Sequence, residues 1–227
     1  MIGIISALNV EMESFRAFIQ NPTSETIAGI PFVSGTVEGK EVVTAVGGIG
    51  KVAAAMCAQA MISTYHPDVI INTGIAGSLS NDLAIGSIAI STSVVQHDVD
   101  TSVLGDPIGY ISEIKRIEIP ADRTVSEHLI ACAKVLGIRT MGGIIASGDQ
   151  FIGSDEKKAY LQEKFHAIAC EMEGGAIGQV CYQNRIPFCI LRAISDSADN
   201  SSKMDYHAFI EMAAAQSVRL LYAYIKA

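Results

Sequence analysis

Long apolar runs are missing from this sequence. Gly, Ser, Asp or Asn interrupts every apolar stretch before it reaches the roughly 20 residues that a membrane-spanning helix requires. We also expect no leader, because the sequence opens with the strand-like residues Ile2 to Ile5 instead of a basic segment followed by an apolar one. We therefore expect a cytoplasmic protein with no membrane partner.

Metal-binding and disulfide patterns are equally scarce. The sequence has five cysteines, and none of them forms a C-x-x-C motif. All lie in or beside apolar segments, which favours reduced core residues over a disulfide or zinc framework. They are Cys57, Cys132, Cys170, Cys181 and Cys189.

Clustered positive charge is absent as well. The formal net charge is −8 and the Lys and Arg residues are scattered, so nucleic acid is not expected as a partner. Hydrophobic residues make up 49% of the 227 residues and charged residues only 18%. This composition predicts one α/β domain over residues 1–227 and leaves room for a buried subunit interface.

Strands and helices are predicted to alternate after an initial hairpin, which favours a three-layer αβα sandwich around a mixed, largely parallel sheet. Strands are expected at 2–7, 32–37, 41–46, 69–72, 85–96, 138–146, 167–171 and 188–194. Helices are expected at 10–19, 51–64, 126–136, 155–165, 174–183 and 205–225. Residues 73–77 read as a flexible loop, and residues 97–120 carry little periodicity.

Two segments resemble ligand sites but fit no complete motif. Gly47 to Lys51 could cradle a phosphate, but Val52 stands where a Walker A loop needs Ser or Thr, and the G-x-G-x-x-G spacing is absent. A tight helix entry is favoured there, with a glycine loop against a sugar as the alternative. His97 to Asp100 has no second histidine at ligand spacing, so structural hydrogen bonding is favoured over a metal site. No G-x-S-x-G elbow or Cys–His pairing supports a covalent nucleophile.

Carboxylates where predicted strands end are the stronger signal. Glu171 and Glu173 close one buried strand, Asp196 closes another, and Glu11 follows the first strand. Each alone is explained by a helix N-terminus or a turn. In a parallel sheet, however, they would meet at the edge where α/β proteins bind ligands, which makes them candidates for chemistry.

Five phrases of the sequence occur in the order found in the purine nucleoside phosphorylase superfamily. They are GGIGKVAAA (47–55), DVIINTGIAG (68–77), ASGDQFI (146–152), EMEG (171–174) and RAISD (192–196). With Glu11, they resemble the phrases of 5'-methylthioadenosine/S-adenosylhomocysteine nucleosidases over essentially the whole chain. The resemblance implies a nucleoside phosphorylase-like fold, a homodimer, no metal, no cofactor, and hydrolysis of the N-glycosidic bond to release adenine. That activity serves methionine salvage and the removal of methyl-cycle by-products, with 5'-deoxyadenosine and aminofutalosine as further candidate substrates.

The same resemblance assigns the catalytic and sugar-binding roles. Glu11 would be the base that activates water, and Asp196, oriented by Ser195, would be the acid that protonates the purine at N7. Glu173 would accept hydrogen bonds from the ribose hydroxyls, and Met172 would pack on the sugar. Glu171 receives no defined role beyond support of the site.

Further positions would shape the pocket. By resemblance, Phe151 stacks on adenine, the Ile152 backbone reads its edge, and Gly77 lies close to the ligand. Arg192 would hold the water and nearby carboxylates, and Ile49 would line the alkylthio pocket.

Some positions extend or depart from the pattern. The loop around Thr101 to Leu104 would complete the pocket of the partner subunit. Tyr206 stands where a pocket Phe is common, Leu8 where Met is common, and Ile75 where some members carry Ser. The phrases at 97–100 and 147–151 resemble the members that also process aminofutalosine.

This division of labour also follows from the chemistry. Adenine leaves poorly unless it is protonated, so an acid on the base and an activated water on the opposite face are both needed. An Asp with an unperturbed pKa of about 3.9 is almost fully ionised at pH 7. We therefore expect burial or a hydrogen bond to raise the pKa of Asp196.

Two other functions fit the residues less well. A phosphorolytic enzyme needs basic residues in the loops after the first strand and after Asn72, and neither 6–9 nor 73–76 contains one. A nucleoside-binding sensor would not need both an acid and a base, and the chain has Glu11 and Asp196 together. Hydrolysis is therefore preferred.

Overall fold

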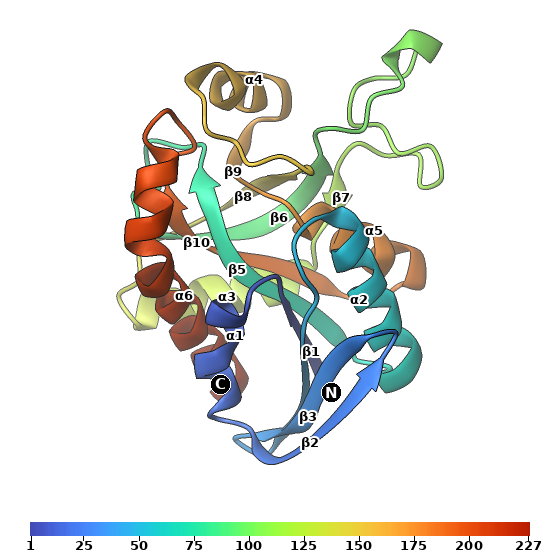
Figure 1. Cartoon of the computed structure of the whole chain (residues 1–227), viewed down its shortest axis with the longest axis vertical. Coiled ribbons are helices and arrows are strands. Elements are labelled where there is room, and N and C mark those ends of the chain that lie inside the picture. Colours follow the sequence, from blue (N-terminus) through green and yellow to red (C-terminus); the bar gives the residue numbers. More distant parts are fainter.

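The computed structural model describes residues 1–227, apart from the side chain of Met204. A ten-stranded mixed sheet runs through the molecule, with helices on both of its faces (Figure 1). The strands are β1 (Ile2–Ser6), β2 (Gln20–Ile27), β3 (Ile30–Val37), β4 (Lys40–Val46), β5 (Val69–Ser78), β6 (Ile88–Gln96), β7 (Ile119–Pro120), β8 (Thr140–Ser147), β9 (Ala167–Glu171) and β10 (Phe188–Asp196). The helices are α1 (Asn9–Arg16), α2 (Lys51–Tyr65), α3 (Arg123–Val135), α4 (Asp155–Phe165), α5 (Gly174–Asn184) and α6 (Ser202–Lys226), with a 3-10 turn at Ser102–Leu104. The predicted fold class is confirmed.

The two faces of the sheet bury separate apolar cores. Helices α2 and α5 cover one face, where Cys57, Met61 and Ile177 are fully buried. Helices α1, α3 and α6 cover the other face, where Phe15 and Leu129 are fully buried (Figure 1). The five cysteines carry free thiols and are buried, as the sequence predicted. Because both faces are covered, the central strands read as continuous apolar runs rather than alternating ones.

Part of the sheet closes on itself. β5 pairs in parallel with β1 and β10, and β10 also pairs antiparallel with β6. From β6 the ladder continues in parallel through β8 to β9, and β9 returns antiparallel to β5 at Gly77↔Cys170. The end of β9 therefore meets β5 from the opposite direction. The carboxylates at the ends of β9 and β10 are therefore brought together by this closure, and not by a single edge of parallel strands.

The clearest departure from prediction is β5. The sequence indicated a flexible loop at 73–77, whereas β5 is buried throughout and continues to Ser78. The extension forms because β10 pairs with it from Ile70 to Gly77, so the backbone groups of the segment are satisfied within the sheet. The prediction of a loop was wrong because neighbouring strands override the weak strand preference of glycine.

Other differences are smaller. The edge strand β2 was not predicted, because seven of its eight residues are exposed and it carries no apolar alternation. Helix α1 ends at Arg16 instead of residue 19, and α6 begins at Ser202 instead of residue 205. Within the part of the chain that the structure describes, no helix combines the length and the apolar character needed to cross a membrane.

Candidate active site

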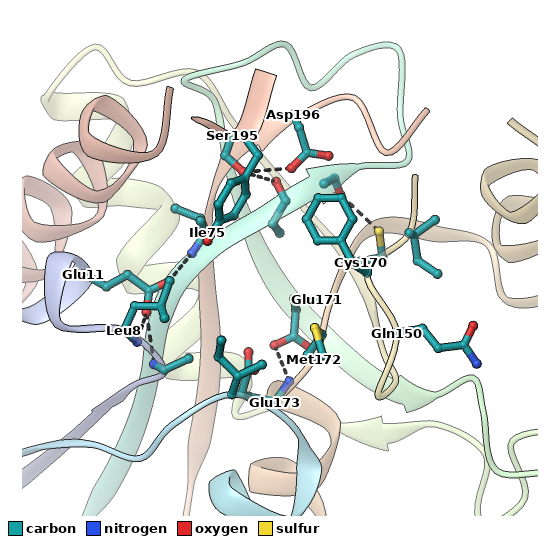
Figure 2. Close-up of a pocket in the computed structure, with 17 residues that line it drawn as sticks. Leu8, Glu11, Ile75, Gln150, Cys170, Glu171, Met172, Glu173, Ser195 and Asp196 are labelled. Atoms are coloured by element: carbon teal, nitrogen blue, oxygen red, sulfur yellow. Dashed lines mark hydrogen bonds between the residues drawn. The ribbon is translucent and has the colours of Figure 1, made fainter. Parts of the chain in front are cut away.

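A cavity with an empty volume of about 650 Å³ opens where β1, β5, β9 and β10 end. Its wall contains every residue that the sequence predicted as catalytic or substrate-binding except Arg192. Figure 2 shows Glu11, Glu173 and Asp196 reaching the cavity from different elements of the fold. The predicted convergence of carboxylates is therefore present, although the roles of these residues are not decided by convergence alone.

Glu11 is held in place by backbone amides. It is 2% exposed, and its Oε2 atom accepts hydrogen bonds from the N–H groups of Ala7 at 3.0 Å and Leu8 at 2.8 Å. The N–H of Ile75 donates to Oε1 at 3.1 Å. Burial raises the pKa of Glu11, and the Arg192 charge and these amides oppose the rise. The result is a rigid carboxylate with increased basicity, which suits a general base.

Asp196 lies at the end of β10 and is 2% exposed. Its Oδ1 accepts from the Ala198 N–H at 2.9 Å, and its Oδ2 accepts from the Ser195 hydroxyl at 2.9 Å. Gly77 makes room for it, because a Cβ at that position would lie 2.8 Å from Oδ1. Burial raises the pKa of Asp196, as expected from the sequence, and this favours the protonated form that a general acid needs.

Glu173 lies at the N-terminus of α5 and touches the glycine loop before α2. Its Oε1 accepts from the Gly50 N–H at 2.9 Å, and its Oε2 is 3.4 Å from the Arg192 guanidinium. Burial, with a smaller effect from Glu171, raises the pKa of Glu173 to about 7. Glycine suits position 50 because its φ is 93°. The glycine loop thus leads directly into α2, which is the interpretation that the sequence favoured, and its Gly50 N–H contacts a candidate sugar-binding carboxylate.

Arg192 lies behind the cavity wall and is fully buried. It donates to the carboxylate of Glu171 and to the side-chain oxygen of Asn72, besides its contact with Glu173. Burial by itself would lower the pKa of Arg192, but the charges of the neighbouring glutamates together outweigh burial and hold the pKa above its ordinary value. Arg192 therefore organises the acidic residues from beneath, and the structure places it at the carboxylates rather than on the cavity surface.

Glu171 connects Arg192 to helix α5. Its carboxylate accepts from the Ser147 hydroxyl and from the N–H groups of Glu173 at 3.1 Å and Gly174 at 2.7 Å. Ser147 in turn accepts from the Gly175 N–H at 2.6 Å. The sequence analysis gave Glu171 no defined role. Its place in EMEG, three residues before an N–H at the start of a helix, was the pattern that could have indicated this contact.

Gly74 is a functional position that the sequence did not single out. A Cβ there would lie 1.9 Å from Nη1 of Arg192 and 2.8 Å from Oε1 of Glu11. Only glycine lets the guanidinium lie against β5 between the carboxylates. The N-T-G phrase in this strand was the available signal.

Thr101 and Leu104 lie away from the cavity. Their segment extends from the body of the protein at the level of β6 (Figure 1), and Leu104 is 80% exposed. Within their own subunit they do not line the wall. Among the described residues, no group of three His, Cys, Asp or Glu side chains is placed to hold a metal ion.

Comparison with known proteins agrees with this geometry. Residues 1–226 match the family described as the phosphorylase superfamily. The chain is 41% identical over 226 residues to the 5'-methylthioadenosine/S-adenosylhomocysteine nucleosidase of Shewanella halifaxensis, covering 99% of this chain and 98% of the relative.

Solved structures are similar over the same length. The Neisseria meningitidis 5'-methylthioadenosine/S-adenosylhomocysteine nucleosidase in complex with methylthio-immucillin-A has a TM-score of 0.96 at 33% identity, covering 99% of this chain and 98% of that one. The futalosine hydrolase of Helicobacter pylori has a TM-score of 0.95 at 35% identity, covering 99% of this chain and 96% of that one.

Loss of the buried cation should destabilise the fold. Arg192→Met leaves carboxylates in the interior without a counter-charge, and we expect a decrease of about 3–5 kcal/mol in the free energy of unfolding. Arg123→Met is the control, because it removes only an exposed pair with Glu127 and should leave the free energy of unfolding nearly unchanged. Urea unfolding measures both. Equal losses in the two variants would contradict the central role of Arg192.

The raised pKa of Glu173 predicts a pH dependence of stability. Folding raises the pKa of this carboxyl from its ordinary value of 4.5 to about 7. The contribution of this carboxyl to the free energy of unfolding is complete below the pKa of the unfolded chain and is lost as the pH rises through the pKa of the folded protein. The reason is that the unfolded chain releases this proton at a lower pH than the folded protein does. Glu173→Gln should therefore flatten the decline in the free energy of unfolding between about pH 4.5 and 7, by up to about 1.4 kcal/mol per pH unit. Chemical denaturation at a series of pH values measures this slope, and identical slopes in both proteins would refute the assignment.

Proposed function

The chain belongs to the phosphorylase superfamily, and we propose that it hydrolyses the N-glycosidic bond of 5'-methylthioadenosine and S-adenosylhomocysteine to release adenine. The observation that carries this proposal is the pairing of two buried carboxyl groups in one cavity. Asp196 has a raised pKa and is oriented by the Ser195 hydroxyl and the Ala198 N–H, while Glu11 is fixed by three backbone amides. The relatives named as nucleosidases support the same conclusion.

Bond cleavage assigns different tasks to the two carboxyl groups. As the bond to the base lengthens, positive charge develops on the sugar and negative charge on the departing purine. Protonated Asp196 gives its proton to N7 of adenine, so that a neutral base leaves. Ionised Glu11 accepts a proton from the water that attacks the anomeric carbon. Glu173 accepts hydrogen bonds from the ribose hydroxyls and holds the sugar between these two groups.

The cavity wall favours water over phosphate as the nucleophile. Among the described residues, no Lys, Arg or His side chain lines the cavity, and Arg192 is already engaged by carboxylates beneath it. A phosphorylase would need cationic groups facing its phosphate. An acidic wall would repel that anion and accept a water molecule.

Aromatic and apolar side chains complete the site. Phe151 is 53% exposed at the cavity and packs edge-on against Tyr206, with ring centroids 5.7 Å apart. We assign Phe151 to stacking on adenine, with the Ile152 backbone reading the edge of the base. Met172 packs on the sugar, Ile49 lines the alkylthio region and Gly77 lies beside the base. The Neisseria nucleosidase was solved in complex with methylthio-immucillin-A, which supports a methylthio-bearing nucleoside as the substrate of this site.

Aminofutalosine and 5'-deoxyadenosine belong to the proposed substrate range. The futalosine hydrolase of Helicobacter pylori has nearly the same fold as this chain, which supports the first of these. The proposed reactions remove methyl-cycle by-products and support methionine salvage. We place them in the cytoplasm, with no cofactor.

The exposed apolar segment around the 3-10 turn supports a homodimer. Val103 is 93% exposed and Leu104 is 80% exposed, while Ile49 and Val52 near the cavity are 58% and 73% exposed. Neighbouring apolar side chains that are exposed together, such as Val103 and Leu104, are characteristic of interaction surfaces, whereas a single exposed one is common on any surface. We propose that Thr101 and Leu104 of one subunit complete the alkylthio region of its partner.

Replacement of the proposed acid tests the reaction. Asp196→Asn keeps an oxygen for the Ala198 N–H but cannot supply the proton, so adenine release should fall by about 10²–10⁴-fold with the fold intact. Adenine release from 5'-methylthioadenosine measures this, with and without phosphate. Asp82→Asn, at an exposed site outside the cavity, is the control. Near-normal turnover would refute the acid assignment, and a strict requirement for phosphate would refute hydrolysis.

A charge on the exposed segment tests the dimer. Leu104→Asp should shift the sedimentation equilibrium toward monomer and raise KM for 5'-methylthioadenosine about 10-fold, because a buried charge opposes association. Val135→Asp is the matched control, because Val135 is 87% exposed on α3. A wild-type monomer, or a dimer that Leu104→Asp leaves unchanged, would contradict this proposal.

A further inference from the structure

Two loops that contact each other contribute to the cavity wall. The glycine loop before α2 carries Ile49, and its Gly50 N–H is bonded to Glu173. The loop after β8 carries Gln150 and Phe151. These loops are about 100 residues apart in the sequence, so their relative position depends on tertiary contacts.

A cluster outside the cavity joins them. The Asp98 carboxylate, just after β6, accepts from the Lys51 ammonium through Oδ1 at 2.7 Å and from the Asp149 N–H through Oδ2 at 2.9 Å. The Asp149 carboxylate accepts from the Lys51 N–H at 2.8 Å, at the first residue of α2. We call Lys51, Asp98 and Asp149 the bridge. None of its members lines the cavity.

The bridge is more than a surface ion pair. The Lys51 and Asp98 side chains are only 18% and 16% exposed, and both Asp98 oxygens are used. Charge-assisted hydrogen bonds of this kind hold geometry better than exposed pairs, whose side chains move freely in water. Close packing adds to the constraint, because a Cβ at Gly50 would lie 2.9 Å from Oδ1 of Asp149.

We propose that Asp98 is a positioning residue for substrate binding. Through Lys51 it places Gly50 against Glu173, and through Asp149 it places the loop that carries Phe151. The bridge therefore sets the separation between the sugar-binding and base-binding walls of the cavity. This inference rests on the proposed function for its kinetic consequence, but the tie between the loops is a property of the fold.

The bridge should affect KM much more than kcat. Glu11 is fixed by Ala7, Leu8 and Ile75, and Asp196 by Ser195 and Ala198, and none of these residues belongs to the bridge. Loss of Asp98 therefore leaves the acid and the base in place while it releases the binding walls. Small displacements of groups that position a substrate are enough to weaken its binding.

Kinetics of three bridge variants test this. Asp98→Ala should raise KM for 5'-methylthioadenosine about 10-fold, equivalent to about 1.4 kcal/mol, with kcat within about 3-fold. Asp98→Asn keeps one acceptor oxygen and turns an amide NH2 toward the other donor, so its KM should lie between those of the wild type and Asp98→Ala. Lys51→Met loses the ammonium but keeps its backbone N–H for Asp149, so its KM should also lie between those of the wild type and Asp98→Ala. The control is Glu127→Ala, which removes the exposed Arg123–Glu127 pair and should leave both constants unchanged.

Hydrogen exchange tests the tie without any substrate. In Asp98→Ala, peptides covering 47–53 and 148–152 should both exchange faster than in the wild type, while Glu127→Ala should change neither. A thermal unfolding midpoint near the wild-type value shows that the variant is folded; if Asp98→Ala does not fold, Asp98→Asn and Lys51→Met give the same comparison.

The outcomes separate the two proposals. A wild-type protein that releases no adenine refutes the proposed function, and the exchange measurement still decides the tie. Unchanged exchange in either loop overturns the bridge. If the wild type is active, the bridge is also overturned when Asp98→Ala has an unaltered KM, or when Asp98→Ala lowers kcat alone.

Discussion

The buried contact between Arg192 and Glu171 is the interaction on which the site depends. A fully buried guanidinium in the interior is tolerated only with compensating charges and hydrogen bonds. Glu171 supplies one charge and also accepts from the amides that begin α5, so the same carboxylate fixes the arginine and the helix that presents Glu173. Gly74 is the steric counterpart, because any side chain there would displace the guanidinium.

The carboxyl groups that line the cavity differ because their partners differ. Glu11 receives three backbone N–H groups and remains suited to accept a proton. Asp196 receives one backbone N–H and one hydroxyl, and burial favours its protonated form. The proposed acid and base thus arise from the same chemical group placed in two environments. The partly closed sheet makes this possible, since β9 and β10 deliver their ends to β5 from opposite directions.

Much of the fold could be predicted from the sequence where the signal was local. The strand 167–171 and the helix 155–165 were predicted with the bounds that the structure shows. An apolar run marks the strand, and Ser154, whose side chain accepts from the Lys157 N–H, marks the start of the helix. Edge strand β2 was missed because its exposed polar residues leave no periodic pattern. The segment 73–77 was mistaken for a loop because its glycines signal flexibility locally, whereas pairing with β10 makes it a buried strand.

By itself, the sequence determined the alternating α/β architecture, the carboxylates at the strand ends, and a resemblance that named the candidate acid and base. These follow from periodicity and short phrases, which are properties of neighbouring residues. Only the tertiary structure decided that Arg192 lies beneath the cavity and that Glu171 holds it there. The same is true of the connection that Asp98 makes between the glycine loop before α2 and the loop after β8. Such contacts join residues separated by tens of positions along the chain, and burial and pKa depend on everything packed around a group. No local pattern carries that information.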